Sequence, residues 1–440
     1  MARSGASEHD GAIGFFGAVS IGVGGMVGGG IFAVLGLAIS LGQGGTFVAF
    51  LIAGLVALVT AYSYARLSVA FPSQGGTVEF LNQAFGSGRF SGSLNVLLWL
   101  SYVITTALYA FAFGSYGSTF LSVAAREVGS HILITGVIVG VAVLNVFSAR
   151  LIAAAEDYIV GAKVLILCAF VVAALLDADF SAIKPGEWAS SLSLVSGGML
   201  IFVAYEGFEL IANSAGDVRS PRKTIPRALY ASVIFTIVLY TLVAVVTVGL
   251  LSLSKIAGSS DFVLAEAARV VWGGVGFKLI AVAALLSTAS AINATLYGTS
   301  RLTVVIAVDG ELPSELERTI GGRPLLGLLI TAVTSLLIAN LIPLSAISSL
   351  ASAGFLIIFA CTNAANVRMA DRTNSRRWLS RIGVVVCAGA LVALVVHISS
   401  TSPADLILLA GLLGLTIAGA VTYQKRVAIM QRRAASSRPG

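Results

Sequence analysis

Three charged residues stand inside long apolar stretches of this sequence, where a charge is costly. Glu206 and Glu209 flank Gly207 in the stretch FVAYEGFEL, and Lys163 lies in the stretch YIVGAKVLIL. Ionisable groups in such surroundings usually face an internal cavity, pair with one another or transfer protons. The alternatives are structural: a glutamate that hydrogen-bonds a neighbouring helix, or a lysine whose ammonium extends to the nearest aqueous boundary.

A glycine-rich segment, GVGGMVGGGIF at residues 22–32, interrupts the first long apolar stretch. Six of the nine residues from Gly22 to Gly30 are glycine. This composition favours local unwinding of a helix, and unwound backbone at membrane depth persists only where it lines a cavity or binds a polar group. Close helix packing through small residues is the alternative.

The composition indicates a membrane protein. Hydrophobic residues make up 57% of the 440 residues and charged residues only 11%, with a mean hydropathy of +0.97, whereas soluble domains carry about 25% charged residues. Cys168, Cys361 and Cys387 lie in apolar stretches without CxxC spacing, and no HExxH, Walker or GxSxG motif occurs. We therefore expect a polytopic membrane protein that is not an enzyme and needs no metal or cofactor.

Apolar stretches of about 20 residues between polar breaks predict an all-α protein with about twelve membrane helices. The predicted helices lie near residues 12–40, 46–71, 92–123, 131–149, 157–176, 191–214, 226–252, 275–303, 324–341, 344–368, 380–398 and 404–424.

The distribution of basic residues predicts the orientation in the membrane. With the N-terminus inside, most of the 27 lysines and arginines fall in cytoplasmic loops, as the positive-inside rule requires. The arm at 1–11 and the basic tail at 425–440 are then both cytoplasmic. The net charge of +7 reflects this topology, and its dispersal over loops of one face gives no support to a nucleic-acid partner.

The first and sixth predicted helices carry the two unusual segments. They are five helices apart, so they cross the membrane in opposite directions. Equivalent interruptions in two inverted units indicate a transporter with a binding site at the bilayer midplane. We therefore expect inverted repeats at 12–176 and 191–368, followed by two peripheral helices over 380–424.

The same segments carry a family resemblance. GVGGMVGGGIF resembles the helix-1 motif of the amino acid–polyamine–organocation (APC) superfamily of transporters and permeases, and GFE followed by SPRKTIPRAL (220–229) resembles their helix 6 and the loop after it. The segments 61–86, 297–313 and 349–369 agree in the same order. The resemblance implies the leucine-transporter fold with a 5+5 inverted repeat, broken helices 1 and 6, and an amino acid as cargo.

A zwitterionic amino acid needs donors for its carboxylate and acceptors for its ammonium. A half-helix that begins near Gly28 would present free N–H groups and the positive end of its dipole, so we expect the amides of Gly28, Gly29 and Gly30 to bind the carboxylate. Matching to the family motif assigns the ammonium to backbone carbonyls of Met26, Val203 and Glu206.

Side chains of the third and sixth helices complete the expected site. In LLWLSYVITTALY (97–109), the candidates are Ser101, Tyr102, Thr105 and Thr106. At the position of Val203 the family often has a bulky aromatic gate, which valine cannot replace, so Phe202 and Tyr205 are the candidates for that gate.

Two residues depart from the family pattern. Glu206 stands where a small or apolar residue is usual, and three roles stay open: binding a cationic side chain, carrying a proton, or hydrogen-bonding the helix break. Arg66 stands where many relatives have an acidic residue, and we expect it to pair with an acid such as Glu79.

Lys163 is the candidate coupling residue. Proton-coupled or sodium-independent APC members have a helix-5 lysine at a similar AKVL position, in the place of a sodium ion. By this resemblance, its ammonium links the fifth helix to the helix-1 break and to Ser287 and Thr288 of the eighth helix, with Glu209 as a further coupling group. Desolvation favours the uncharged amine, which would let Lys163 release and regain a proton.

The sequence therefore predicts a proton-coupled, sodium-independent secondary transporter of amino acids in the cell membrane. An obligate amino acid exchanger, in which Lys163 stays charged, and a sensor that binds an amino acid without transport are the alternatives. Neither the particular amino acid nor the oligomeric state follows from the sequence.

Overall fold

The computed structural model describes residues 12–147 and 149–436. The predicted arm at 1–11 and the last four residues of the predicted tail, 437–440, lie outside the described residues. Within the described ranges the protein is helical, and β-structure is limited to three isolated bridges. The α-helices are α1 (Phe15–Met26), α2 (Gly30–Gly42), α3 (Thr46–Ala70), α4 (Thr77–Phe85), α5 (Arg89–Ser118), α6 (Arg126–Phe147), α7 (Ala149–Ala174), α8 (Ser191–Leu200), α9 (Leu210–Asn213), α10 (Pro221–Leu250), α11 (Leu253–Ala257), α12 (Val263–Val308), α13 (Leu325–Leu341), α14 (Leu344–Arg368), α15 (Ala370–Thr373), α16 (Arg377–Thr401) and α17 (Pro403–Ser436).

The helices are long and apolar enough for a multi-pass membrane protein. In the described residues, seven helices meet the length and hydropathy of a membrane span, and the bent pair α1–α2 makes an eighth. Four further predicted spans coincide with shorter apolar helices over Tyr158–Ala174, Ser191–Leu200, Leu325–Leu341 and Pro403–Gly419. The count of twelve and the division into inverted repeats stay predictions.

Both unusual segments are breaks in the helical backbone. α1 ends at Met26 and α2 begins at Gly30, with a bend of 46° between them. The sixth predicted helix is divided into α8, a short 3-10 helix η4 (Phe202–Tyr205), and α9. Glu206 between η4 and α9 has an extended backbone (φ −63°, ψ 148°), and Gly207 has φ +117°. The two breaks touch, because a Cβ on Gly207 would lie 2.6 Å from the Gly25 carbonyl carbon.

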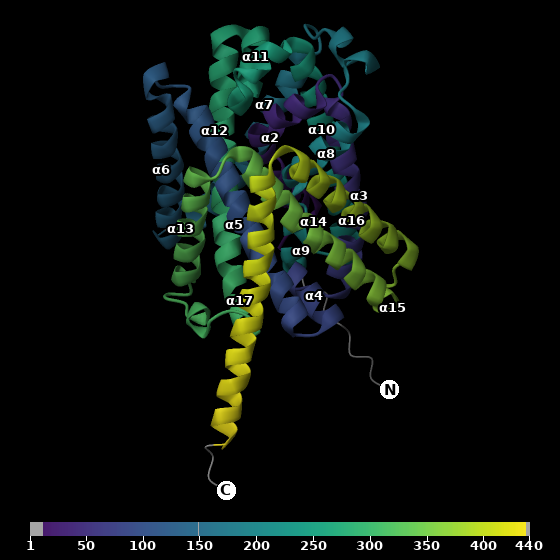
Figure 1. Ribbon diagram of the computed structural model, residues 1–440, viewed down its shortest axis with the longest axis vertical. Coiled ribbons are helices and arrows are strands. Elements are labelled where there is room, and N and C mark those ends of the chain that lie inside the picture. Colours follow the sequence, from purple (N-terminus) through teal and green to yellow (C-terminus); the bar gives the residue numbers. More distant parts are fainter. Residues whose placement is uncertain (1–11, 148, 437–440) are drawn as a thin grey trace.

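The remaining helices surround these breaks. α10 packs against α3 and α1, α12 packs against α5, and α14 packs against α5 and α16. In Figure 1, α6 and α13 lie at one side of the bundle and α16 at the other, while α17 runs past the lower end of the other helices. The broken helices are therefore held inside a shell of longer ones.

Three elements differ most from the predicted boundaries. The helix expected at 404–424 is α17, which continues to Ser436 and so includes most of the predicted tail. The helix expected at 275–303 is the longer α12, which contains a break at Gly273. The nine-residue α4 was not predicted as a separate helix, because it is too short to span a membrane and its sequence merges with the polar end of the second apolar stretch. α4 lies at the lower end of the bundle in Figure 1.

Candidate binding cavity at the helix breaks

A cavity of about 550 Å³ lies against the two helix breaks. Its wall includes Ser20, Ile21, Gly24 and Gly25 of α1, Leu98 and Tyr102 of α5, residues at and after the second break (Glu206, Leu210, Asn213, Ser214 and Asp217), and several residues of α12 from Asn293 to Val305. Gln74, Asp217 and Arg301 are exposed, so the cavity opens near the start of α4 and the end of α12. By the predicted topology, this is the cytoplasmic side.

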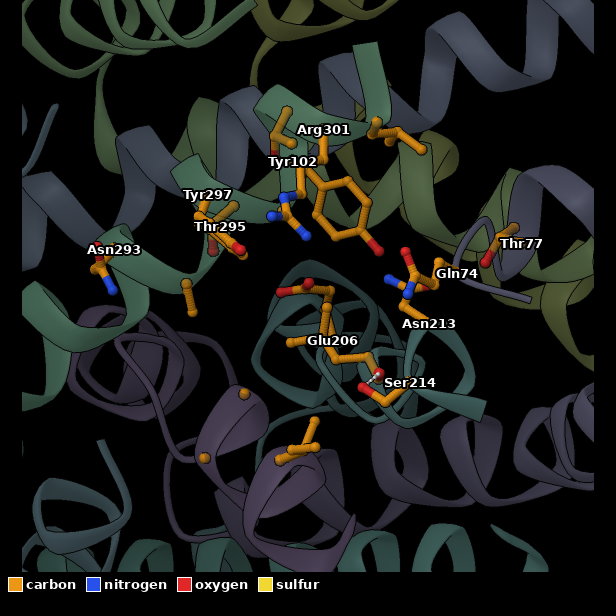
Figure 2. A pocket seen from close by; sticks show the side chains of 18 of the residues that line it. Gln74, Thr77, Tyr102, Glu206, Asn213, Ser214, Asn293, Thr295, Tyr297 and Arg301 are labelled. Atoms are coloured by element: carbon orange, nitrogen blue, oxygen red, sulfur yellow. Dashed lines mark hydrogen bonds between the residues drawn. The ribbon is translucent and has the colours of Figure 1, made fainter. Parts of the chain in front are cut away.

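Glu206 forms part of the buried inner wall. Its side chain is only 3% exposed yet lines the cavity, and Figure 2 shows Glu206 and Tyr102 both projecting into this space. The Tyr109 hydroxyl donates a hydrogen bond of 3.0 Å to Glu206 Oε2. A carboxylate has room for several donors, so a group in the cavity can still reach Glu206.

Glu209 lies behind this wall and is not exposed to solvent. It accepts hydrogen bonds from the Gly207 amide at 2.9 Å and from the Tyr102 hydroxyl at 3.2 Å. Its carboxyl group also lies within hydrogen-bonding reach of that of Glu206. The two glutamates therefore form a pair, which we call the break pair, with one tyrosine of α5 donating to each.

Side chains occupy the carbonyls that the unwound part of the first broken helix exposes. The Tyr240 hydroxyl donates to Met26 O at 2.5 Å, and the Ser287 hydroxyl donates to Val27 O and Gly28 O at 3.0 and 2.7 Å. Unpaired backbone groups are costly in an apolar medium, and these donors therefore stabilise the break.

Lys163 contacts the same break from α7. Its side chain is only 2% exposed, and Nζ donates to Gly24 O at 2.9 Å. The alternative of an ammonium extended to the aqueous boundary is therefore wrong. The Ser287 hydroxyl also reaches this break, whereas the Thr288 hydroxyl donates to Ala284 O in its own helix. The predicted link from the Lys163 ammonium to these two hydroxyls stays a prediction.

Several predicted substrate-binding residues lie outside the cavity wall. Gly29 is covered by the Tyr109 ring and Gly30 by Ala204, each close enough to exclude a Cβ. Their proposed role in binding a carboxylate, like that of Gly28 and Met26, stays a prediction. In this arrangement, the cavity reaches α1 at Gly24 and Gly25 instead.

The predicted residues of η4 and α5 are also enclosed. Phe202, Val203 and Tyr205 are fully buried; the Val203 amide donates to Ser352 Oγ and the Tyr205 hydroxyl donates to Phe50 O. The Thr106 hydroxyl donates to Tyr102 O in its own helix. The roles assigned to these residues stay predictions too, and of the predicted substrate-binding set only Tyr102 and Glu206 line the cavity.

Sequence reasoning missed a pair of asparagines in the wall. Asn145 of α6 donates through Nδ2 to Asn293 Oδ1 of α12 at 2.8 Å, and both line the cavity. The available signal was an amide side chain in each of two apolar helices, a pattern that marks polar contacts inside membranes. Only the fold brings these two residues, 148 positions apart, together.

The expected pairing of Arg66 with Glu79 is wrong. The Arg66 guanidinium carbon lies 5.6 Å from the centre of the Tyr62 ring, and Glu79 accepts a hydrogen bond from Gln83 in α4. Tyr62 is in the same helix as Arg66, and Gln83 is in the same helix as Glu79. Each charged side chain therefore contacts its own helix, and the predicted ion pair between α3 and α4 does not form.

Comparisons with known proteins agree with this architecture. Residues 13–415 match the family model for amino acid permeases. The chain is 31% identical to the inner membrane transport protein YbaT of Escherichia coli, over 94% of this chain and 96% of that protein. It is 31% identical to the protein MJ0609 of Methanocaldococcus jannaschii, over 86% and 88%.

A third relative bears the name of a specific permease. The branched-chain amino acid permease BcaP of Bacillus subtilis is 25% identical to this chain, over 83% of this chain and 82% of that protein. The relatives with functional names are thus transporters or permeases and not enzymes. From the match over nearly its whole length, together with the apolar helices, this chain is a multi-pass membrane protein that belongs to the amino acid permease family.

Proposed function

We propose that this protein is a proton-coupled, sodium-independent secondary transporter of amino acids across the cytoplasmic membrane, with both termini on the cytoplasmic side. The main support for this proposal is the buried Lys163 ammonium, which donates a hydrogen bond to Gly24 O. Gly24 itself lines the cavity at the helix breaks. During alternating access, this cavity would open first to one side of the membrane and then to the other.

The position of Lys163 supports coupling to protons. As a cation, Lys163 donates to the Gly24 carbonyl and holds α1 against α7. Loss of its proton would remove both the positive charge and one donor. Under this proposal, the positive charge at the Gly24 carbonyl takes the role of a sodium ion, which prefers oxygen ligands. In this proposal Glu209, Ser287 and Thr288 support the same coupling region.

The proposed substrate site includes the predicted residues that are now enclosed. Gly29 lies against Tyr109, Gly30 against Ala204 and Gly28 against Ala291, so these residues must move away before a substrate can reach the three amides. Met26, Thr106, Phe202, Val203 and Tyr205 surround the same break, so a shift of α1 would rearrange all of them together. Such a shift is the kind of gating motion that alternating access uses.

Uptake into proteoliposomes tests this proposal. The purified protein is given a mixture of labelled L-amino acids under an inward proton gradient, a sodium gradient, or neither; leucine, isoleucine and valine are the first to be tested singly, because BcaP carries their name. We expect uptake driven by protons alone and lost in Lys163→Ala. Lys278→Ala, at an exposed lysine, is the matched control and should retain uptake.

Other outcomes would replace the proposal. Counterflow that does not depend on either gradient would identify an exchanger in which Lys163 keeps its charge. Binding of amino acids without any flux would identify a sensor. Uptake that requires sodium, or that persists under a proton gradient in Lys163→Ala, would overturn the coupling mechanism.

A further inference from the structure

We infer that an anionic phospholipid binds where α1 and α10 begin, with its phosphate between Lys223 and Arg227. A hollow of about 150 Å³ lies there, lined by Phe15 of α1 and by Lys223, Thr224 and Arg227 of α10. None of these residues lines the cavity at the helix breaks. The inference therefore goes beyond the proposed function and does not depend on it.

The first argument is positive charge without an acidic partner. Lys223 and Arg227 are exposed and four residues apart in α10, so their side chains lie on one face of the helix and repel each other. The sequence has no acidic residue from 218 to 260. In the part of the chain that the structure describes, neither side chain forms an ion pair. An anion between the two would remove the repulsion.

The second argument is the depth of these charges in the membrane. Arg227 is the last charged residue of α10, which continues to Leu250 as an apolar helix. From Arg227 to Leu250 the helix rises about 35 Å, close to the thickness of the hydrocarbon core of a bilayer. Arg227 therefore lies at the edge of the hydrocarbon, and Lys223 lies about 6 Å farther out. Lipid phosphates lie at this level.

The third argument is the apolar surface that follows the two cations along the same face of α10. Ile234 and Val238 are exposed, and helical geometry places them within an arc of about 60° that also contains Lys223 and Arg227. A phosphate at the two cations would therefore leave its acyl chains beside Ile234 and Val238. This arrangement fits a molecule with a charged head and apolar tails, whereas a free anion would contact the cations alone.

The lining of the hollow favours an anionic lipid over a zwitterionic one. It contains two cations and no acidic side chain, so nothing in it would bind the ammonium group of a zwitterionic head. By the proposed orientation, the hollow faces the cytoplasmic leaflet, whose anionic lipids attract basic segments next to membrane helices. The inference therefore names a lipid with a net negative charge as the partner.

Native mass spectrometry of the purified full-length protein tests this site. Palmitoyl-oleoyl phosphatidylglycerol is compared with palmitoyl-oleoyl phosphatidylcholine, which has the same acyl chains and no net charge. We expect the wild type to bind the first phosphatidylglycerol molecule more tightly than phosphatidylcholine. The double variant Lys223→Gln with Arg227→Gln should weaken phosphatidylglycerol binding about 30-fold, because each basic side chain near a lipid surface contributes a factor of about 5.

A second pair of arginines provides the matched control. Arg377 and Arg381 have the same spacing at the start of α16, but Arg377 already pairs with Asp371 at 2.7 Å. The double variant Arg377→Gln with Arg381→Gln should therefore change phosphatidylglycerol binding much less. Equal weakening in the two double variants would assign the binding to the general positive charge of the protein and would overturn the site.

Two further outcomes would overturn the inference. Equal affinity of the wild type for both lipids would show that the head-group charge is not recognised. Displacement of phosphatidylglycerol by an equal concentration of inorganic phosphate would show that the acyl chains contribute nothing and that the hollow binds a free anion. Both outcomes are read on the wild type, so they decide even if the double variant does not fold.

Discussion

Two groups of carboxyl side chains each contain a buried glutamate, Glu206 in one and Glu311 in the other, and the surroundings of the two groups differ. The break pair, Glu206 and Glu209, lies on unwound backbone beside the cavity. The second group, which we call the α12-end cluster, consists of Asp309 and Glu311 with Asn82 of α4 and Asn95 of α5. Glu206 and Glu311 are almost equally buried, at 3% and 2% exposed.

The α12-end cluster has the geometry of a structural contact. Asn95 Nδ2 donates to Glu311 Oε2 at 2.7 Å and Asn82 Nδ2 donates to Asp309 Oδ2 at 2.7 Å, which joins the end of α12 to α4 and α5. Its glutamate does not line the cavity. The comparison teaches that burial alone does not identify a binding carboxylate, because both glutamates are buried and accept a hydrogen bond but only Glu206 lines the cavity.

The largest expected effect comes from adding one methyl group at each cluster. Gly207 (φ +117°) faces the Gly25 backbone, and a Cβ would lie 2.6 Å from Gly25 C, whereas Gly310 (φ +74°) has open space. Gly207→Ala adds a clash with the Gly25 backbone to the strain of a positive φ. We expect it to lower the free energy of unfolding by roughly 3 kcal/mol or more and to abolish uptake. Gly310→Ala adds strain alone and should cost about 1–2 kcal/mol. Thermal unfolding in detergent measures both, and equal losses would contradict the tight contact between the breaks.

The next effect separates the two glutamates by function. Glu206→Gln should raise KM about 10- to 100-fold, while Glu311→Gln should change it less than about 2-fold, because replacement at a site without ligand contact keeps the substrate hydrogen bonds. Uptake kinetics of both variants, at equal amounts of reconstituted protein, check this difference. A larger effect at Glu311 would reverse the assignment of the two clusters.

The α12-end cluster should make stability depend on pH. Burial raises the pKa of Glu311 from 4.5 to about 7, and the neighbouring Asp309 raises it further while Asn95 lowers it. The folded protein then binds more protons than the unfolded chain between these values, so the contribution is fully present below pH 4.5 and is lost as pH rises through about 7. Thermal unfolding between pH 5 and pH 8 should show this fall, and Glu311→Gln should reduce it. An unchanged pH dependence in the variant would assign the fall to other groups.

The smallest effects are expected from the tyrosines of the break pair. Tyr109→Phe removes the donor to Glu206 and Tyr102→Phe removes the longer bond to Glu209. Each loses about 1–2 kcal/mol of hydrogen bonding at most, and only the first acts on the carboxylate in the cavity. We expect a several-fold rise in KM for Tyr109→Phe and a smaller one for Tyr102→Phe. The opposite order would point to Glu209 as the substrate-facing group.

Local composition was sufficient to predict most elements of this fold. Apolar length predicts the helices because each must satisfy its backbone within the membrane, and α14 spans the predicted range of 344–368. The glycine run and the stretch around Glu206 predict the two breaks for the same reason. α4 and the full length of α12 were missed, since amphipathic or partly polar helix ends carry no such length signal.

The sequence by itself determined that the chain is a membrane protein with two interrupted helices and three costly buried charges, because composition and helix-breaking residues act locally. Tertiary structure alone decided which partners those charges have. It brought Lys163 to Gly24, Ser287 to Gly28 and Asn145 to Asn293, and it covered Gly29 with Tyr109. Such contacts depend on how helices distant in sequence pack together, and no local pattern specifies that packing.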